Sequence, residues 1–154
     1  MPDFARRTDL PDQSATEALA ARLAPRLSAG DTLLLSGAIG AGKTTFARAL
    51  IRARLGRAED VPSPTFTLVQ TYAADRVEIW HADLYRLSDP QEVLELGLDE
   101  AFTNAICLVE WPDRLGPDAP ADALSMRFEA GATGHAVTLS GLGRWADLLA
   151  DAHV

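Results

Sequence analysis

The fold is decided by the stretch Gly37-Ala-Ile-Gly-Ala-Gly42-Lys43-Thr44, which matches the pattern G-x-x-x-x-G-K-[ST]. Before it lies the apolar run Thr32 to Ser36, which has no polar alternation, as expected of a strand covered on both faces. After it, Phe46 and Leu50 start an apolar helical face that ends near Gly56. A glycine-rich turn between a buried strand and a helix is the context in which this pattern forms a phosphate-binding loop.

The loop predicts a cradle for the phosphates of a nucleotide. Its glycines let backbone amides surround phosphate oxygens, and the start of the following helix adds a positive dipole end. Lys43 is the only lysine among the 14 basic residues, and we expect its ammonium at the β- and γ-phosphates. A plain glycine-rich turn would not explain that placement. The predicted nucleotide-binding residues of the loop are Gly40, Ala41, Gly42, Lys43, Thr44 and Thr45.

Magnesium at such a loop needs an acidic partner at the end of a neighbouring strand. Glu110 closes the apolar strand Ala105 to Val109, and we expect it to share the metal with the Thr44 hydroxyl. Asp83 ends another strand and is predicted to orient the attacking water or to bind metal through water; the alternative is a turn cap. The candidate catalytic residues are therefore Lys43, Asp83 and Glu110.

Other side chains near these motifs allow both a functional and a structural interpretation. Ser63-Pro64-Thr65 is either a switch beside the γ-phosphate or a rigid loop. Trp111 either stacks on the base or packs in the core, and Arg86 or Arg114 could neutralise phosphate charge. His81, two residues before Asp83, is either functional or a packed strand residue.

Composition excludes several classes of protein. The chain has 154 residues, 47% of them hydrophobic, which is typical of one domain with its own core. A net charge of −8 disfavours strong nucleic-acid or membrane binding and favours a protein partner. No signal-peptide core or membrane span is visible, so we expect a cytoplasmic protein. Cys107 is the only cysteine and is expected in the core, without chemistry.

The remaining pattern predicts a single three-layer α/β P-loop NTPase domain over residues 1–154, with a mixed, mainly parallel central sheet and antiparallel hairpin additions. The strands at 32–36 and 105–109 should be parallel. A capping box from Ser14 to Glu17 predicts the start of a helix over 14–28. The other expected elements are an extended arm or strand in 1–12, a hairpin of 67–72 with 77–83, a helix from Pro90 to Leu96, a hairpin of 124–128 with 136–139, and a terminal helix over 143–152.

Taken together, the motifs resemble those of the bacterial TsaE family, small P-loop ATPases of tRNA threonylcarbamoyladenosine (t6A) biosynthesis. The similar segments occur in the same order and are Leu10 to Thr16, Gly40 to Phe46, Ser63 to Thr67, His81 to Arg86, Glu95 to Asp99 and Leu108 to Pro112. Gly37-Ala38 stands where members often carry Gly-Asp or Gly-Glu, so an acidic residue of the loop is absent. After Gly116 only a general likeness remains.

The resemblance implies a cytoplasmic, magnesium-dependent ATPase, a monomer on its own, that binds ATP and ADP and acts on the TsaB–TsaD complex. Within that family picture the protein resets TsaB–TsaD through ATP binding and hydrolysis and does not itself transfer threonylcarbamoyl to tRNA. By position, Lys43 and Thr44 hold phosphates and magnesium, Glu110 belongs to the magnesium shell and Asp83 assists hydrolysis. Ser63 to Thr67 resemble the family's switch segment. Trp111 resembles a residue near the nucleotide.

Two other functions share the phosphate cradle. A P-loop kinase would transfer the phosphoryl group to a small molecule, but the chain shows no arginine-rich lid segment. A nucleotide-occupancy switch would signal by binding and would scarcely hydrolyse. The second alternative stays open at the level of sequence, because a slow ATPase and a switch carry the same motif.

Overall fold

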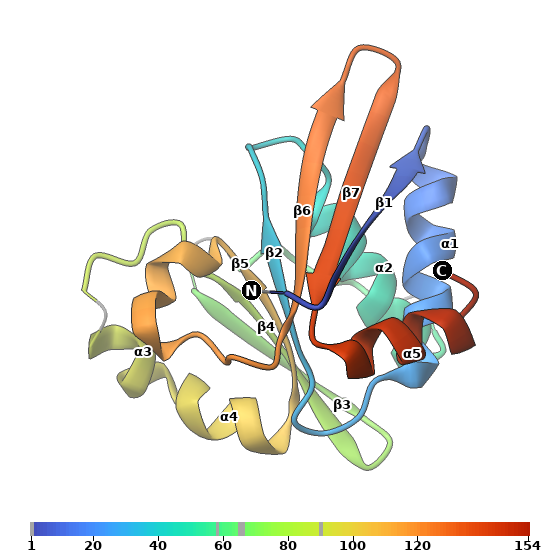
Figure 1. Ribbon diagram of the computed structural model, residues 1–154. Coiled ribbons are helices and arrows are strands. Elements are labelled where there is room, and N and C mark those ends of the chain that lie inside the picture. The colour runs from blue at the N-terminus through green and yellow to red at the C-terminus, as the bar shows by residue number, and fades with distance from the viewer. Residues whose placement is uncertain (1, 58, 65–66, 90) are drawn as a thin grey trace.

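The computed structural model describes residues 2–57, 59–64, 67–89 and 91–154, and it shows a seven-stranded sheet with helices on both faces (Figure 1). Two 3-10 segments, η1 (Ala24–Arg26) and η2 (Pro112–Asp118), follow α1 and β5. The strands and helices in chain order are β1 (Phe4–Leu10), α1 (Gln13–Leu23), β2 (Thr32–Ser36), α2 (Lys43–Leu55), β3 (Val69–Ala74), β4 (Val77–Asp83), α3 (Gln91–Leu96), α4 (Leu98–Asn104), β5 (Ile106–Glu110), β6 (Leu124–Gly131), β7 (Gly134–Gly141) and α5 (Gly143–Asp151).

The sheet has parallel strands in the middle and antiparallel strands at its edges. Its order is β1-β7-β6-β2-β5-β4-β3, and β2 pairs in parallel with both β5 and β6, as β4 does with β5. The hairpins β3–β4 and β6–β7 are antiparallel, and β1 adds antiparallel to β7. The predicted mixed α/β sheet, including the parallel pair β2 and β5, is therefore confirmed.

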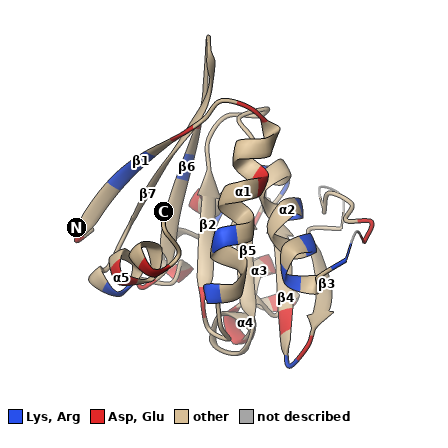
Figure 2. Ribbon diagram, turned by 90° about the vertical axis from the view of Figure 1, so that its right-hand side faces the viewer, with Lys and Arg blue, Asp and Glu red and all other residues tan. Residues whose placement is uncertain are grey.

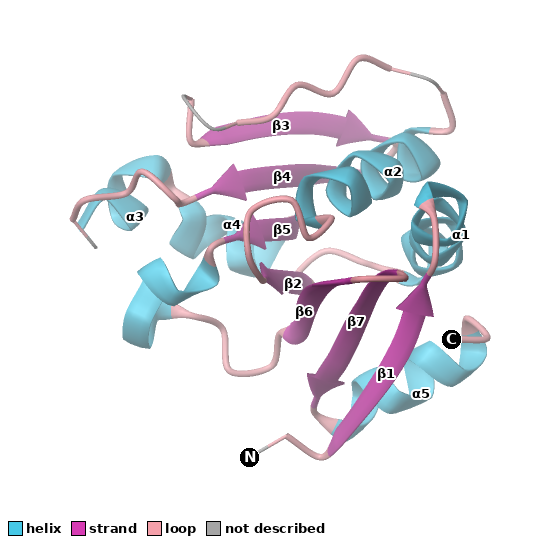
Figure 3. Ribbon diagram, turned by 90° about the horizontal axis from the view of Figure 1, so that it is seen from above, coloured by secondary structure: helices cyan, strands magenta, loops and turns pink. Residues whose placement is uncertain are grey.

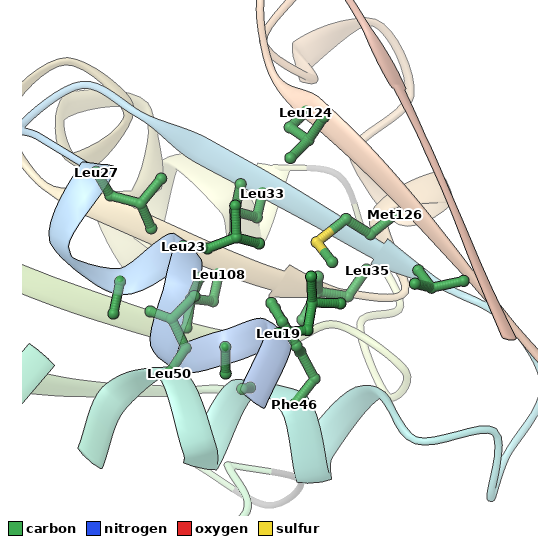
Figure 4. Packing of buried hydrophobic residues seen from close by; sticks show 14 of the residues in the cluster. Leu19, Leu23, Leu27, Leu33, Leu35, Phe46, Leu50, Leu108, Leu124 and Met126 are labelled. Carbon is green, nitrogen blue, oxygen red and sulfur yellow. The ribbon is translucent and has the colours of Figure 1, made fainter. Parts of the chain in front are cut away.

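Helical layers cover the two faces of this sheet, as the view from above shows (Figure 3). On one face, leucines of α1 pack against Phe46 and Leu50 of α2 and against the leucines of β2 (Figure 4). Trp145 of α5 belongs to the same core cluster. On the other face, Val93 and Leu98 pack with β5 side chains such as Val109. Since β2 and β5 lie between two cores, their apolar runs need no alternation, and the three-layer prediction holds.

The first helix differs from its prediction at both ends. Asp12, not Ser14, caps it, because the Asp12 carboxylate accepts a hydrogen bond from the Ala15 amide at 2.9 Å. The α-helix ends at Leu23 instead of continuing to 28. Pro25 removes an amide donor there, and the chain continues as the 3-10 segment η1.

The elements of the middle of the chain are shifted or supplemented relative to the sequence pattern. Strand β3 begins at Val69 and not at Thr67, since Leu68 lies in the left-handed region with φ 68°. The predicted helix start at Pro90 lies outside the described residues, and α3 is described over Gln91–Leu96. A helix not predicted, α4, follows Gly97 directly. The hairpin of β6 and β7 is longer than predicted, and the terminal helix is confirmed as α5.

Several charged residues lie at the helix ends where the helix dipole favours them (Figure 2). Arg22 lies in the last turn of α1, and Arg52 and Arg54 lie in the last turn of α2. The first turn of α4 instead carries Asp99 and Glu100. Within the described ranges, no helix combines the length and the apolar character that crossing a bilayer requires.

Candidate functional site

The candidate site lies at the carboxyl ends of three adjacent parallel strands. The loop of residues 37–42 leaves β2, Glu110 is the last residue of β5, and Asp83 is the last residue of β4. In the sheet register Glu110 is the partner of Asp83 on one side and of Leu35 on the other. The carboxyl edge of a parallel sheet is where α/β proteins bind ligands, and the predicted residues meet at this edge.

Glycines shape the loop between β2 and α2. Gly37 has φ 129°, and a Cβ at this position would lie 2.3 Å from the Phe128 carbonyl oxygen, so only glycine lets the loop start against β6. Gly42, with φ 110°, is the N-cap of α2. The helix therefore presents the positive end of its dipole, and amides of its first turn, toward the loop.

Lys43 is held inside the loop. Its Nζ donates to the carbonyl oxygens of Gly37 at 2.5 Å and Ala38 at 3.1 Å, and it lies 4.2 Å from the centroid of the Trp111 ring. Burial lowers the pKa of Lys43 below the usual lysine value, and the carboxylates of Glu110 and Asp83 oppose that shift. The Lys43 residue is 5% exposed, and its Nζ lies between the carbonyl oxygens of Gly37 and Ala38 and the Trp111 ring.

A chain of three hydrogen-bonded side chains crosses the site. The Thr44 hydroxyl donates to Glu110 Oε1 at 2.7 Å, and Glu110 Oε2 lies 2.7 Å from Nε2 of His81. Glu110 is 2% exposed and His81 has no exposed surface. The structure thus brings the two predicted magnesium ligands into direct contact and adds His81 behind them.

Asp83 and Trp111 close one side of the site. The Asp83 carboxylate accepts a hydrogen bond from the Tyr85 amide at 3.0 Å, so it forms the turn that was the alternative interpretation, while still lining the pocket. Trp111 has left-handed backbone angles, φ 60° and ψ 53°. Its ring lies 4.9 Å from that of Tyr85, centroid to centroid, at 46°. Trp111 therefore contacts both the Lys43 ammonium and the Tyr85 ring beside the loop.

These groups surround a pocket of about 530 Å³. Of the predicted nucleotide-binding residues, all except Ala41 line it; Ala41 is buried, and its amide donates to the Ala38 carbonyl at 3.1 Å. The sequence interpretation missed the opposite wall. That wall consists of Leu10, Pro11, Asp12, Gln13, Thr16, Gly134 and His135.

The missed wall is made by sheet pairing between distant segments. Leu10 at the end of β1 is the register partner of His135 at the start of β7, so the β1–α1 turn and the β6–β7 turn meet beside the loop. The only sequence signal for it was the family likeness of Leu10 to Thr16. His135 carried none, because a histidine after a glycine turn has no distinguishing pattern.

Of the other residues predicted near the nucleotide, some line the pocket and others do not. Arg86 lines the pocket, whereas Arg114 lies exposed in η2 and is not one of the lining residues. Thr65 and Phe66 of the predicted switch lie outside the described residues. Ser63 and Thr67, which are described, do not line the pocket, and the switch role stays a prediction.

The donor set fits a magnesium–nucleotide complex. Magnesium prefers oxygen ligands and usually takes one or two from the protein and others from phosphates and water, as a Thr44 hydroxyl and a Glu110 carboxylate in contact would allow. The phosphates would then face the amides at the start of α2 and the Lys43 ammonium.

The fold and this site together define an α/β domain of the P-loop NTPase class. The chain belongs to the TsaE family: the family model described as "Threonylcarbamoyl adenosine biosynthesis protein TsaE" matches residues 10–137. Curated relatives are named tRNA threonylcarbamoyladenosine biosynthesis protein TsaE. That of Rickettsia conorii is 44% identical over 104 residues, which are 68% of this chain and 59% of the relative.

Two comparisons cover nearly the whole chain. The Bacillus subtilis TsaE protein is 35% identical over 147 residues, 94% of this chain and 90% of the relative. The crystal structure of Bacillus subtilis YdiB superposes with a TM-score of 0.78 and 30% identity, covering 99% of this chain and 96% of that one. The chain spans about three fifths of the length of the first Rickettsia relatives.

Proposed function

We propose that the protein is a magnesium-dependent ATPase that serves t6A modification of tRNA by binding and resetting the TsaB–TsaD complex. The observation that carries the proposal is the contact between Thr44 and Glu110 beside the loop that holds Lys43. A phosphate cradle, a buried cation and a hydroxyl–carboxylate pair in one pocket are the parts that phosphoryl transfer from ATP requires.

Each side chain has a defined task in this proposal. Lys43 leaves the carbonyls of Gly37 and Ala38 and binds the β- and γ-phosphate oxygens. Thr44 and Glu110 hold Mg²⁺, which when bound neutralises charge on the phosphate oxygens. Asp83 accepts a hydrogen bond from the water that attacks the γ-phosphorus as the bond to the departing ADP oxygen breaks.

The rest of the pocket offers room for the nucleoside part of a nucleotide. Trp111 and Tyr85 form one aromatic side, and the β1–α1 turn with His135 forms the other. We propose that the nucleoside lies between these walls. The choice of ATP and of the tRNA pathway rests on family membership and not on these contacts.

The balance of charge supports action through a protein partner. A net charge of −8 disfavours direct binding to the phosphate backbone of tRNA. We therefore propose that the protein acts in the cytoplasm on TsaB–TsaD and not on nucleic acid. Energy from the nucleotide would then bias the partner between two states, since only differential binding shifts an equilibrium.

The test is phosphate release from ATP by the purified full chain, alone and with the TsaB–TsaD pair, for the wild type and for Glu110→Ala. We expect slow release alone, stimulation by TsaB–TsaD, and loss of the stimulated rate in the variant. Circular dichroism of the variant shows whether the fold is kept. Tight ATP binding without stimulated release would replace the ATPase proposal with the occupancy switch, and transfer of phosphate to a small molecule would indicate a kinase.

A further inference from the structure

His81 is a buried side chain that the proposed function leaves without a task. It lies on β4 two residues before Asp83, so the two side chains lie on the same face of the strand. It has no exposed surface and does not line the pocket. Whatever His81 contributes to the site must therefore pass through a neighbouring side chain.

That neighbour is Glu110. The 2.7 Å contact between His81 Nε2 and Glu110 Oε2 complements the 2.7 Å contact between Thr44 and Oε1, so each carboxylate oxygen has its own partner. A carboxylate held at both oxygens has one orientation about its terminal torsion, whereas a singly held one can rotate.

The cost of burying His81 argues that this contact is its role. Its second nitrogen, Nδ1, has no hydrogen-bond partner among the described residues, and an unpaired buried polar atom lowers stability. An apolar side chain would fill the same volume without that cost. Donation from an Nε2–H leaves Nδ1 as a bare acceptor, and this tautomer fits the single contact.

We propose that His81 is a positioning residue for magnesium: it fixes Glu110 so that Oε1 stays directed at Thr44 and the metal. The inference rests on the proposed function, because it assigns Glu110 to the magnesium shell. Partners that orient a ligand from behind it typically change metal affinity by about 10- to 100-fold when they are removed.

The experiment compares His81→Asn with His81→Gln in the full chain. Both carry a primary amide, but the longer glutamine places its N–H near the position of imidazole Nε2, and asparagine falls short of Glu110. Nucleotide affinity is measured by calorimetry with ATP at increasing Mg²⁺ and, separately, in the presence of a chelator. Mn²⁺ binding to the protein–nucleotide complex is followed by electron paramagnetic resonance.

We expect His81→Asn to raise the Mg²⁺ and Mn²⁺ concentrations for half-saturation by about 10-fold or more, and His81→Gln to restore them to within about 3-fold of wild type. Affinity measured with chelator should be the same within about 2-fold in all three proteins, since His81 does not touch the nucleotide pocket. If His81→Asn does not fold, His81→Met fills the volume without a donor and carries the same expectation.

Failure of this inference is distinguishable from failure of the proposed function. If Glu110→Gln loses the metal-dependent affinity and His81→Asn keeps it, the positioning role is overturned and the magnesium site stands. Equal losses with metal and with chelator would also overturn it, because they indicate a purely structural histidine. A wild type whose ATP affinity does not respond to Mg²⁺ would instead contradict the magnesium site itself.

Discussion

Thr44 and Glu110, 66 positions apart in the sequence, share a 2.7 Å hydrogen bond between the first turn of α2 and the last residue of β5. Pairing of β2 with β5 brings them together, because the loop after β2 starts α2 beside the end of β5. The bond holds two hard oxygen donors in adjacent positions before any nucleotide arrives, and preorganised ligands lose less entropy on binding.

Removing the hydroxyl should therefore weaken metal-dependent nucleotide binding selectively. We expect Thr44→Val to lower ATP affinity in Mg²⁺ by about 10-fold, or about 1.4 kcal/mol, and to leave affinity in chelator nearly unchanged. Thr44→Ser keeps the hydroxyl and is the matched control, with affinity near that of wild type. Calorimetry with and without Mg²⁺ measures both. A Thr44→Ser protein as weak as Thr44→Val would contradict a role for the hydroxyl.

Lys43 should limit stability while it enables binding. Because burial lowers its pKa in the folded state, the unfolded chain binds more protons between that pKa and the ordinary lysine value of about 10.4. The free energy of unfolding of the wild type therefore falls as pH decreases from about 10.4 to the lowered pKa of Lys43, and it rises again when pH increases through the same window. We expect Lys43→Met to be more stable than wild type at neutral pH, with a gap that narrows toward about pH 10.4 in urea unfolding.

The same Lys43→Met protein should not bind ATP, since the cation that faces the phosphates is gone. Native-like circular dichroism serves as the control for the fold. Unchanged ATP affinity in a folded Lys43→Met protein would overturn the phosphate site, and a stability gap that widens with pH would contradict the assigned pKa direction.

Gly37 should be far less tolerant of substitution than Gly56. Both have positive φ, but a Cβ on Gly37 would lie 2.3 Å from the Phe128 carbonyl oxygen, and one on Gly56 would meet nothing within 4 Å. We expect Gly56→Ala to cost about 1 kcal/mol of left-handed strain and Gly37→Ala about 3 kcal/mol or more, since β6 must also shift. Urea unfolding measures both. Equal losses in the free energy of unfolding would show that the start of the loop moves away from β6 at little cost.

The strand–loop–helix core of the site was predictable from sequence because its signals are local. Residues 32–56 carry a buried strand, a glycine turn and a helix in uninterrupted order, and Glu110 follows directly on an apolar strand. Both hairpins were predictable for the same reason: their turns join neighbouring strands. Because ligands bind at the carboxyl ends of parallel strands, the position of the site at the ends of these strands could then be inferred.

The second wall of the pocket was not predictable, because it depends on pairing between the two ends of the chain. β1 meets β7 only once the strand order is known, and Leu10 and His135 carry no local signal of their contact. The predicted N-cap of α1 was wrong for another reason. Asp12 and Ser14 are both good N-cap residues and lie two positions apart, so the backbone geometry decides which of them caps the helix. The His81–Glu110 contact required the parallel register of β4 and β5.

Cys107 should be chemically silent in the native protein. Burial raises the pKa of its thiol to about 12, so at about pH 8 the reactive thiolate is scarcely populated as well as inaccessible. We expect no reaction with a disulfide reagent in the native state and one equivalent after unfolding in urea. Because the unfolded thiol ionises near 8.5, stability should fall as pH rises from there toward 12, and Cys107→Ala should lack this loss. Rapid native labelling would contradict the burial.

Arg54 should contribute more to stability than Arg57, although Arg54 lies in the last turn of α2 and Arg57 only two residues beyond its end. Its Nη1 donates to the carbonyl oxygens of Ala24 and Leu27, each at 2.7 Å, and so ties α2 to the turn where Pro25 ends the first helix. Arg57 instead forms a surface ion pair with Glu59 at 3.1 Å.

Methionine at either position keeps much of the side-chain length and removes the donors. We expect Arg54→Met to lower the free energy of unfolding by about 2 to 3 kcal/mol, because two carbonyls lose a charged donor, and Arg57→Met by less than about 1 kcal/mol, as is usual for exposed pairs. Urea unfolding of the two variants measures the difference. Because Arg54 lies at the end of α2 far from the phosphate loop, the Arg54→Met protein should bind ATP normally while it is folded. Equal losses from the two variants would show that water replaces the Arg54 contacts without cost.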